Sequence, residues 1–447
     1  MSLRSFLEEM EEKERILRVR EPVSPRFEVS SILKGFDGGP VLLFENIEGY
    51  ETEIAANLCG TRQRICSALD TGLEGLYKKL TEACSSPGPP RTVKECPVKE
   101  VVEKPDLSKI PVLTHFERDA GPYITSAIVS ARSSDGKVEN VSVHRLQVLN
   151  ERKLAIRLVP RHLYRMWRMA KEERKDLEVA IALGLHPAVL LAASSPASFG
   201  VSEFGVANTL LRGEMPITKC ENVDAYAPAD AELVLEGTIS VGREVVEGPF
   251  VDITGTYDIQ RSQPVVELVG VMHRENYIYQ ALLPSGMEHK LLMGLPHETT
   301  IWEAVSRVVP IVKAVNLSAG GCGWLHAIIS IEKQTDGDAK NALMAAFGAH
   351  GSLKHAVIVD TDIDVYNPEE VEWAMATRFQ AGEDLVIIPN VRGSTLDPST
   401  NQETALTTKL GIDATRPLVK PREKFERAKI PTNERVVKII NDIRESR

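Results

Sequence analysis

The stretch Glu247-Gly-Pro-Phe-Val-Asp252-Ile-Thr-Gly-Thr-Tyr257 places two carboxylates five residues apart around a Gly-Pro turn. The runs on either side, 231–240 and 265–272, are largely apolar and predict β-strands. We therefore expect both acids in a structured bend between strands, where a rigid scaffold can direct them into one cleft. Two carboxylates in one cleft can take separate roles, one as an acid and one as a charged partner. The alternative is an exposed acidic turn.

Composition and charge exclude several classes of protein. The chain has 447 residues, enough for about two to four domains. Its net charge of −10 argues against nonspecific nucleic-acid binding, which depends on Lys and Arg neutralising phosphates. Six cysteines occur without a C-x-x-C pair, which indicates free or buried thiols in a reducing compartment. The acidic N-terminus is unlike a signal peptide and no apolar run reaches membrane-spanning length, so we expect a cytoplasmic protein without a membrane span.

Hydrophobic periodicity predicts three domains, over residues 1–110, 111–300 and 301–447. The first domain has predicted helices at 2–13, 27–34 and 64–83 and predicted strands at 16–20 and 40–46. This mixture indicates an α/β domain, which ends in the turn-rich segment 85–91. The second domain has one predicted helix, at 161–173, and predicted strands at 124–131, 138–149, 154–158, 179–183, 188–193 and 232–241. This strand-rich pattern favours a barrel or split barrel.

The third part alternates strands at 324–331, 355–360 and 384–389 with helices at 300–309, 338–348 and 368–379. This alternation predicts βαβ units and a mainly parallel sheet, so the fold class is α/β (α+β). Lys354 stands just before one of these strands, where the sheet edge could offer it to a ligand. The tail, 433–447, is an amphipathic helix that could cover its own domain or pack on a partner subunit.

One predicted strand carries an unusual set of polar residues, Asn140-Val-Ser-Val-His-Arg145. Because side chains alternate along a strand, Asn140, Ser142 and His144 share one face and Arg145 lies on the other. Arg145 is the candidate for holding a carboxylate, since its planar guanidinium can bind both oxygens at once. The alternative is a solvated sheet edge.

A second set of residues could bind an ion or a phosphate. Asn140, His162 and Glu203 would form a mixed N/O ligand set suited to Mn²⁺ or Mg²⁺, with phosphate oxygens completing the shell. Ser194 and Ser195 follow the strand predicted at 188–193 and could reach a phosphate or an ion. The alternatives are a structural histidine and an ordinary turn.

The order of these pieces resembles the UbiD family of decarboxylases. The matching series is Asn140-x4-Arg145, Arg161-His162, Ser194-Ser195, Glu203 and Glu247-Gly-Pro-Phe-x-Asp252, with Asn57-Leu-x-Gly-Thr-Arg62, Ala120–Thr125, Val359–Asp364, Leu396-Asp-Pro398 and Gly411–Thr415 elsewhere. The resemblance covers almost the whole chain. It implies an N-terminal α/β domain, a central split β-barrel related to flavin-binding proteins, and a C-terminal α/β domain whose terminal helix often contributes to the interface of a homodimer or higher homo-oligomer.

The resemblance also implies a cofactor and roles for the site residues. The cofactor would be prenylated FMN, made by a separate flavin prenyltransferase. A divalent ion, Mn²⁺ or Mg²⁺, would be held against its phosphate, K⁺ would bind near Ser194, and Lys354 would contact the phosphate. Arg145 would orient the substrate carboxylate, Glu247 would hold Arg145, and Asp252 would donate a proton. The residues implied are Asn140, His162 and Glu203 as metal ligands and Asn140, Ser142, Arg145, Arg161, His162, Ser194, Ser195, Glu203 and Lys354 around the cofactor.

The family decarboxylates several unsaturated acids. Some members act on aromatic acids such as polyprenyl-hydroxybenzoates, others on cinnamate-type acids, and a compact archaeal-type branch acts on trans-anhydromevalonate 5-phosphate in a variant mevalonate pathway. The short C-terminal region and Asp252 resemble that branch, which implies isopentenyl phosphate as product. Arg157, Arg161 and Lys290 are candidates for binding a substrate phosphate. The alternatives are a 4-hydroxybenzoate-type decarboxylase of quinone biosynthesis and a non-catalytic cofactor-binding or assembly protein of the same fold.

Overall fold

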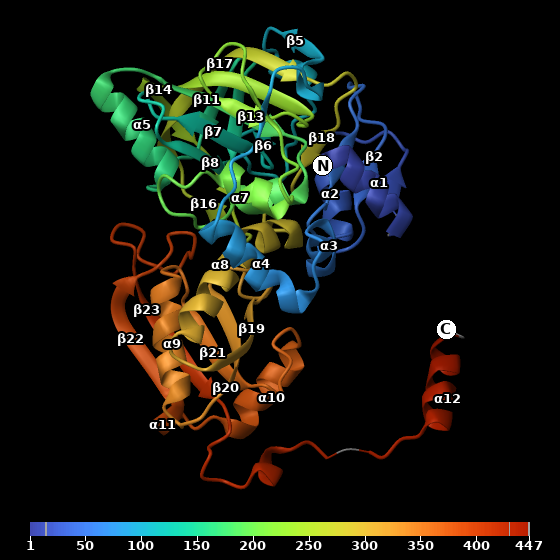
Figure 1. Cartoon of the computed structure of the whole chain (residues 1–447), viewed down its shortest axis with the longest axis vertical. Coiled ribbons are helices and arrows are strands. Elements are labelled where there is room, and N and C mark those ends of the chain that lie inside the picture. The colour runs from blue at the N-terminus through green and yellow to red at the C-terminus, as the bar shows by residue number, and fades with distance from the viewer. Residues whose placement is uncertain (14–15, 429, 446–447) are drawn as a thin grey trace.

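The fold is mixed α/β, which confirms the predicted fold class. The computed structural model describes residues 1–13, 16–428 and 430–445. The N-terminal segment lies beside a large central sheet, and the C-terminal sheet with its helices lies below both in Figure 1. Within the described residues, no helix has the length and apolar character needed to cross a bilayer.

The N-terminal segment forms a small sheet covered by helices. Its elements are α1 (Leu3–Lys13), β1 (Leu17–Val19), α2 (Glu28–Gly35), β2 (Leu42–Phe44) and β3 (Ile54–Ala56). The sheet has the order β1-β2-β3-β18, so β18 (Tyr279–Ala281) returns from far along the chain to pair with β3. The face of α1 that the sequence predicts to be apolar is buried through Leu3, Phe6, Leu7 and Met10.

The single helix expected at 64–83 is wrong, because the structure has α3 (Arg62–Ala68) and α4 (Leu73–Ser85). Asp70 adopts a left-handed backbone with φ of 47°, which cannot continue a helix, and Gly72 is the N-cap of the next one. Apolar residues continue across the break in both helices, so periodicity alone does not reveal it.

The central sheet has nine antiparallel strands, in the order β6-β9-β10-β17-β14-β11-β7-β8 with β5 paired to β17. They are β5 (Val101–Glu103), β6 (Tyr123–Ile124), β7 (Ile128–Arg132), β8 (Glu139–Val143), β9 (Leu146–Asn150), β10 (Lys153–Ile156), β11 (Leu177–Leu183), β14 (Leu233–Glu247) and β17 (Arg261–His273). The strand predicted at 138–149 is thus two strands, and Arg145 lies in the short connection between them. The long strand β14 ends at Glu247, opposite Arg261 of β17.

Helices and small sheets surround this sheet. The helices are α5 (His162–Glu173), α6 (Pro187–Ala193) and α7 (Glu203–Leu210). A three-stranded sheet contains β4 (Thr92–Val93), β12 (Ile217–Lys219) and β13 (Tyr226–Pro228), and a hairpin contains β15 (Phe250–Val251) and β16 (Tyr257–Asp258). Two 3₁₀ turns are η1 (Pro97–Lys99) and η2 (Leu107–Lys109). Helices α5, α6 and α7 all pack against β8. Strand β8 therefore lies next to the three helices that carry or adjoin His162, Ser194 and Glu203.

The strand expected at 188–193 is wrong, because these residues belong to α6. All seven residues of α6 are buried, and a short apolar run without a polar face cannot distinguish a buried helix from a buried strand. The helix begins where Nδ1 of His186 accepts the Ala188 N–H at 3.2 Å and Pro187 occupies the first turn, a position that suits proline. Ser194 is consequently the C-cap of a helix.

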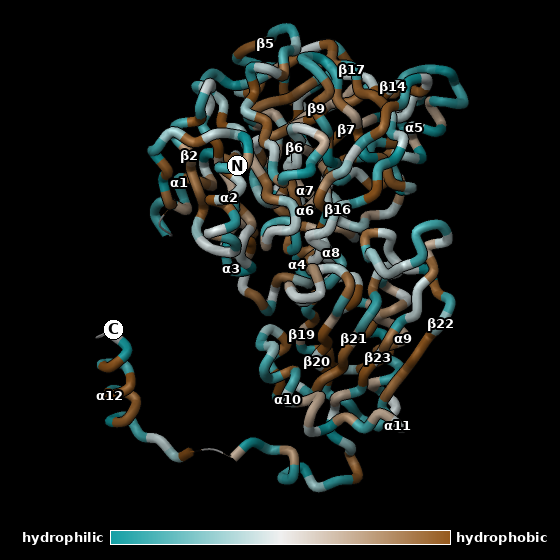
Figure 2. The backbone as a smooth tube through the Cα atoms, turned by 180° about the vertical axis from the view of Figure 1, so that it is seen from behind, coloured by the Kyte–Doolittle hydropathy of each residue, from teal (hydrophilic) through white to brown (hydrophobic). Residues whose placement is uncertain are grey.

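The C-terminal part is a five-stranded sheet in the order β19-β20-β21-β23-β22. Its elements are α8 (Met287–Ser306), β19 (Ile311–Leu317), β20 (His326–Glu332), α9 (Asp338–Ala349), β21 (His355–Asp360), α10 (Pro368–Arg378), α11 (Ala381–Asp384), β22 (Leu385–Arg392), β23 (Leu406–Ala414) and the 3₁₀ turn η3 (Arg422–Phe425). The sheet is parallel only from β20 to β23, and both edge strands are antiparallel, which corrects the expectation of a mainly parallel sheet. The apolar strands β20 and β21 lie inside this part in Figure 2.

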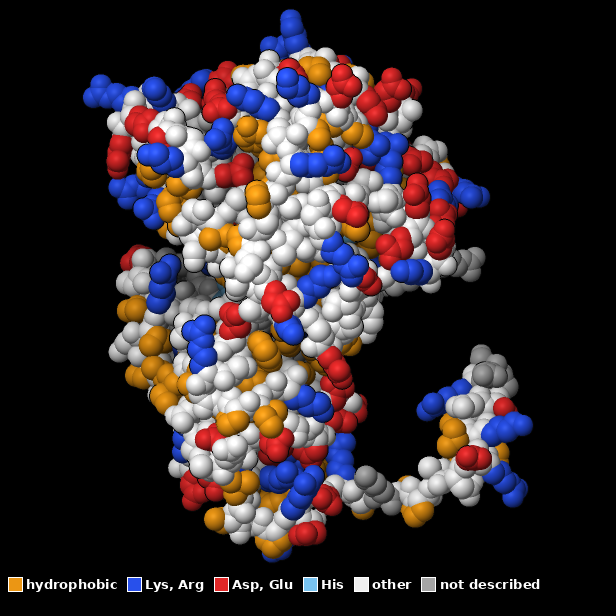
Figure 3. Space-filling view, in the orientation of Figure 1, with side chains coloured by type: hydrophobic (Ala, Val, Ile, Leu, Met, Phe, Trp, Pro, Cys, Tyr) orange, Lys and Arg blue, Asp and Glu red, His pale blue; other side chains and the backbone are white. Residues whose placement is uncertain are grey.

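Helix α12 (Glu434–Glu445) lies apart from the rest of the chain, at the end of an extended segment (Figures 1 and 3). Its presence confirms the predicted terminal helix; the last two residues of the predicted range lie outside the described residues. The apolar side chains of Val436, Val437, Ile439 and Ile440 are exposed on it.

Glu298 of α8 connects the N-terminal and C-terminal parts. Its buried carboxylate accepts hydrogen bonds from both terminal nitrogens of Arg62, from the Tyr77 hydroxyl at 3.3 Å, and from the Leu317 N–H at 2.7 Å. One side chain therefore links α3, α4 and β19 through α8.

Replacing Glu298 by Gln should destabilise the protein by about 3 kcal/mol, because it leaves the buried Arg62 guanidinium without its anion. Urea unfolding followed by circular dichroism measures the change. Glu303→Gln on the same helix is the control, since Glu303 forms no ion pair among the described residues. A difference below about 0.5 kcal/mol between the two variants would contradict this role for the Glu298 carboxylate.

Candidate active site

Arg145 is surrounded by three carboxylates. Its Nε donates to Oε1 of Glu247 at 3.0 Å and its Nη2 to Oε2 of the same residue at 3.0 Å. Its Nη1 donates to Oδ2 of Asp252 at 2.7 Å, and Nη2 also donates to Oδ2 of Asp258 at 3.1 Å. The structure thus brings the three expected catalytic residues, Arg145, Glu247 and Asp252, into direct contact.

The hairpin that follows β14 places these acids. Phe250 and Val251 of β15 pair with Asp258 and Tyr257 of β16, and the turn between them is closed by the Gly255 N–H donating to the Asp252 carbonyl at 2.8 Å. Gly255 has φ of 77°, a conformation that other residues adopt only with strain. This hairpin folds the chain back, so that Asp252 and Asp258, six residues apart in the sequence, both contact Arg145.

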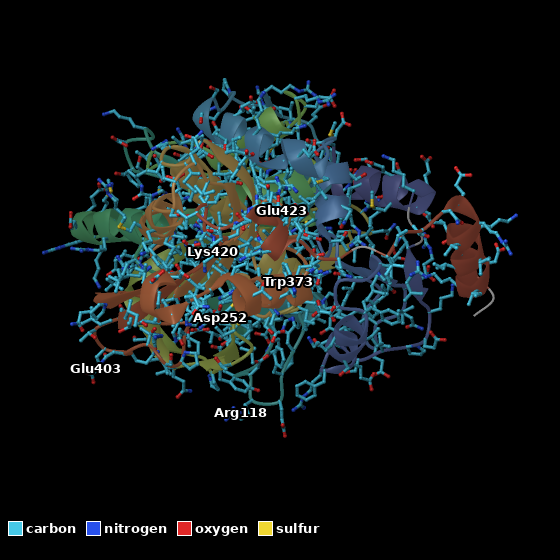
Figure 4. All side chains as sticks on the ribbon, turned by 90° about the horizontal axis from the view of Figure 1, so that it is seen from below. Arg118, Asp252, Trp373, Glu403, Lys420 and Glu423 are labelled. Carbon is cyan, nitrogen blue, oxygen red and sulfur yellow. The ribbon has the colours of Figure 1, made fainter. Side chains whose placement is uncertain are left out.

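The three carboxylates differ in their exposure to solvent. The side chains of Glu247 and Asp258 are 0% and 3% exposed, whereas Asp252 is 19% exposed. Asp252 is therefore the carboxylate that a ligand can reach, and it lies within the outline of the molecule in Figure 4, inward from Arg118 at its edge. Glu247 is further fixed by the Tyr123 hydroxyl, which donates to its Oε1 at 3.1 Å.

Arg145 keeps its positive charge at this buried position. Burial alone would lower its pKa, but the negative charges of Glu247 and Asp252 outweigh that effect and raise the pKa. The ring of Phe250 adds a cation–π contact, with its centroid 5.0 Å from Cζ of Arg145. The charge that would hold a substrate carboxylate is thus built into the folded protein.

Two neighbouring residues were missed at the sequence level. Asp258 binds Arg145, and its Oδ1 also accepts from Nη1 of Arg261 at 3.2 Å. The imidazole of His289 on α8 lies in the electrostatic field of Asp252 and Arg145, and burial lowers its pKa. Asp258 could have been found as the acid that closes the hairpin, but no sequence signal pointed to His289.

Asn140 and Glu203 meet beside β8. Glu203 accepts the Val141 N–H at 2.7 Å and an Asn140 amide N–H at 3.3 Å, and both side chains are buried. Burial raises the pKa of Glu203 to about 7, more than these hydrogen bonds lower it. Ser142 is engaged differently: His144 donates through Nδ1 to the Arg157 carbonyl, so its Nε2 accepts the Ser142 hydroxyl at 2.9 Å.

His162 does not join Asn140 and Glu203 directly. Its ring packs edge-on against Phe199, with centroids 5.4 Å apart, and among the described residues no hydrogen bond connects it to the other two. Nor do three His, Cys, Asp or Glu side chains converge as metal ligands anywhere in the described part of the chain. His162 instead lines a groove of about 470 Å³ along α5, with Pro160, Arg161, Tyr164, Arg165, Arg168, Met169 and Glu172.

The remaining expected residues are bound within the fold. The hydroxyls of Ser194 and Ser195 donate to carbonyls of the helix that precedes them, Leu190 and Ala192, at 2.8 and 2.7 Å. Lys354 is paired with Asp397 at 2.7 Å, so it does not present an unpaired charge. Asp397 belongs to the Leu396-Asp-Pro398 stretch quoted above, which the sequence did not connect with Lys354.

Comparisons with known proteins match the chain over nearly its whole length. Three family models match residues 7–84, 91–287 and 290–414; they are described as the 3-octaprenyl-4-hydroxybenzoate carboxy-lyase N-terminal, Rift-related and C-terminal domains. A protein from Methanothermobacter thermautotrophicus, named anhydromevalonate phosphate decarboxylase, is 44% identical over 425 residues, which covers 95% of this chain and 99% of that protein.

Two solved structures of the UbiD-class enzyme HmfF from Pelotomaculum thermopropionicum have the same fold. The first, in complex with FMN, is 44% identical with a TM-score of 0.94 and covers 96% of this chain and 98% of that one. The second, an evolved dimeric form in complex with prFMN, is 42% identical with a TM-score of 0.90 and covers 96% of this chain and 97% of that one.

The raised pKa of Glu203 makes stability depend on pH. An unfolded Glu titrates near about 4.3, whereas the folded carboxyl titrates near 7, so ionisation is disfavoured only in the folded state. In metal-free protein this group should contribute stability below pH 4.3 that is lost as pH rises to 7, by up to about 3 kcal/mol. Urea unfolding in EDTA at several pH values gives the free energy of unfolding as a function of pH. The difference between the wild type and Glu203→Gln is the contribution of the Glu203 carboxyl. Parallel curves for the two proteins would refute it.

Proposed function

Because the chain belongs to the UbiD family, we propose that it is a prenylated-FMN-dependent decarboxylase of an α,β-unsaturated acid. The substrate we propose is trans-anhydromevalonate 5-phosphate, with isopentenyl phosphate as product in a variant mevalonate pathway. The observation that carries the proposal is the contact of Arg145 with Glu247 and Asp252. The substrate assignment is supported by the relatives named for this acid, whose identity extends over nearly the full length.

Two of the three residues expected to hold the metal, Asn140 and Glu203, lie together and suit a divalent ion, whereas His162 packs against Phe199. Glu203 is a buried carboxyl whose pKa is raised by burial, and it forms no ion pair with any residue in the described part of the chain. Its oxygens with Oδ1 of Asn140 suit a hard divalent ion. His162, at the start of α5, would be the third ligand to Mn²⁺ or Mg²⁺. Arg161 and the other arginines of the α5 groove would attract an anionic cofactor phosphate.

Two further ligand roles follow from the family resemblance. Ser194 would line a site for K⁺ together with its backbone neighbours. Lys354 would contact the cofactor phosphate, which requires it to give up or share its ion pair with Asp397.

The chain's own residues would bind the acid and deliver a proton. When bound, the modified flavin supplies the electron sink that loss of CO₂ from an sp² carbon requires. Arg145 uses four of its five N–H groups on carboxylates, and the remaining one is on Nη1, beside Asp252. We infer that the substrate carboxylate binds at Nη1 and takes the place of Asp252. Asp252, released from Arg145, would then carry a proton and transfer it to the carbon that loses CO₂.

Glu247 has the complementary role. Its two oxygens fix Nε and Nη2 of Arg145, and Tyr123 fixes Glu247 in turn, so the Nη1 edge keeps one orientation. A non-catalytic protein of the same fold would gain little from a buried arginine with three carboxylates, because apolar residues of similar volume in place of a buried ion pair are often equally or more stabilising. This argues against the binding-protein alternative.

Assembly and location complete the proposal. Helix α12 exposes an apolar face that a second copy would cover, and one of the related structures is a dimeric form. A homo-oligomer, a cytoplasmic location and dependence on a flavin prenyltransferase stay predictions.

Asp252→Asn and Glu247→Gln should each lower CO₂ release at least about 100-fold in protein produced together with a flavin prenyltransferase, because the first removes the proton donor and the second frees Arg145. CO₂ release is measured with trans-anhydromevalonate 5-phosphate and, separately, with 4-hydroxybenzoate. Glu244→Gln, at an exposed position of β14, is the control for expression and flavin content.

Full activity of either variant would overturn the assigned catalytic residues. Activity of the wild type on 4-hydroxybenzoate alone would replace the proposed substrate by the aromatic alternative.

A further inference from the structure

Arg157 lies next to Arg145 but is bonded very differently. It follows β10, and its N–H donates to the Arg145 carbonyl at 3.2 Å, so the two residues are adjacent where the chain enters β9 and leaves β10. Its side chain is only 14% exposed. Among the described residues its one ion-pair partner is Asp258, with Nε 3.7 Å from Oδ2, which is too long for a hydrogen bond. Among the described residues, the Arg157 guanidinium therefore donates no hydrogen bond.

Three arginines share the carboxylate of Asp258. Arg145 and Arg261 donate hydrogen bonds to it at 3.1 and 3.2 Å, and Arg157 stands at the longer distance. Burial lowers the pKa of Arg157, and the charges of Arg145 and Arg261 add to the decrease while Asp258 opposes it. A buried guanidinium with one distant anion and no hydrogen bond is unfavourable, so this position is suited to receive a further anion.

We propose that Arg157, with Arg261 beside it, forms a subsite for the phosphate monoester of the substrate; this inference rests on the proposed function. Arg145 and Arg157 approach the same oxygen of Asp258, so their contacting nitrogens are no more than about 7 Å apart. A short acid that carries a carboxylate at one end and a phosphate at the other can then contact both arginines at once. Asp258 would hold the two guanidinium groups at a fixed separation.

The other basic candidates are placed less well for this role. Arg161 lies in the groove along α5 beside His162, where the cofactor phosphate is expected. Lys290 forms no ion pair with Glu247, Asp252 or Asp258. A phosphate monoester at Arg157 could also belong to the flavin, and the experiment must separate these two sources.

The test uses Arg157→Met and Arg157→Lys in the flavin-loaded enzyme. The values of kcat/KM are measured for the phosphorylated acid and for the same acid without phosphate, and the Kd for FMN is measured on flavin-free protein by fluorescence quenching. Arg157→Met should lower the preference for the phosphorylated acid by about 30-fold or more, the effect of losing charge-assisted hydrogen bonds, with the Kd for FMN unchanged. Arg157→Lys should keep part of the preference.

Two control variants sharpen the test. Arg243→Met, an exposed arginine of β14 paired with Glu267, should leave the preference and FMN binding unchanged. Lys290→Met should also leave the preference unchanged. If Arg157→Met does not fold, Arg157→Lys and Arg157→Gln carry the same comparison.

Each contrary result has a distinct meaning. A preference that survives in Arg157→Met, or is lost in Lys290→Met instead, overturns the phosphate subsite alone. If Arg157→Met loses affinity for FMN but keeps the preference for the phosphorylated acid, Arg157 binds the phosphate of the cofactor. That result also overturns the proposed subsite for the substrate phosphate. A wild-type enzyme that decarboxylates the acid without phosphate as well as the phosphorylated one removes the subsite, whereas one inactive on both acids overturns the proposed function and the subsite with it.

Discussion

The guanidinium of Arg145, enclosed by Glu247, Asp252 and Asp258, is the interaction on which the site depends. Such a cluster is stable only when each charge is paired, because removing one partner leaves an uncompensated buried charge. Arg157 and Arg261 supply two more positive charges around Asp258, so three arginines face three carboxylates. The charges are nearly balanced, and the most exposed member, Asp252, is the one that can exchange its partner for a ligand.

The fold makes this cluster through a few local features. The chain leaves the sheet between β8 and β9, so Arg145 is outside the strands. Strand β14 runs on to Glu247, and the β15–β16 hairpin follows it. Helix α7 packs on β8 and places Glu203 within hydrogen-bonding distance of Asn140. The C-terminal part is joined to the N-terminal helices α3 and α4 by hydrogen bonds that include those of the buried Glu298 carboxylate.

The sequence predicted the parts of this account that are encoded in local order. The alternation of elements predicted the fold class. The acids of the stretch 247–257 and the strand that ends at Arg145 pointed to Arg145, Glu247 and Asp252, which the structure brings into contact; their catalytic roles stay a prediction. Residues brought in by long-range geometry were missed, such as His289, or assigned without their partner, such as Lys354 with Asp397. The strand expected at 188–193 failed for a different reason, because a fully buried apolar segment has no periodicity by which to recognise a helix.

Proton delivery by Asp252 to the carbon that loses CO₂ is the central claim, and isotope incorporation tests it most directly. The flavin-loaded enzyme would be incubated with trans-anhydromevalonate 5-phosphate in D₂O, and the product examined by mass spectrometry and deuterium NMR. A carboxyl proton exchanges with solvent, so the account predicts one deuterium at the carbon that carried the carboxylate, with one CO₂ released for each product molecule. Because any exchangeable acid would give the same label, Asp252→Asn is incubated in parallel, and the account predicts that it forms the deuterated product at least about 100-fold more slowly. A product without deuterium at that carbon, or deuterated product formed by Asp252→Asn at the wild-type rate, would contradict it.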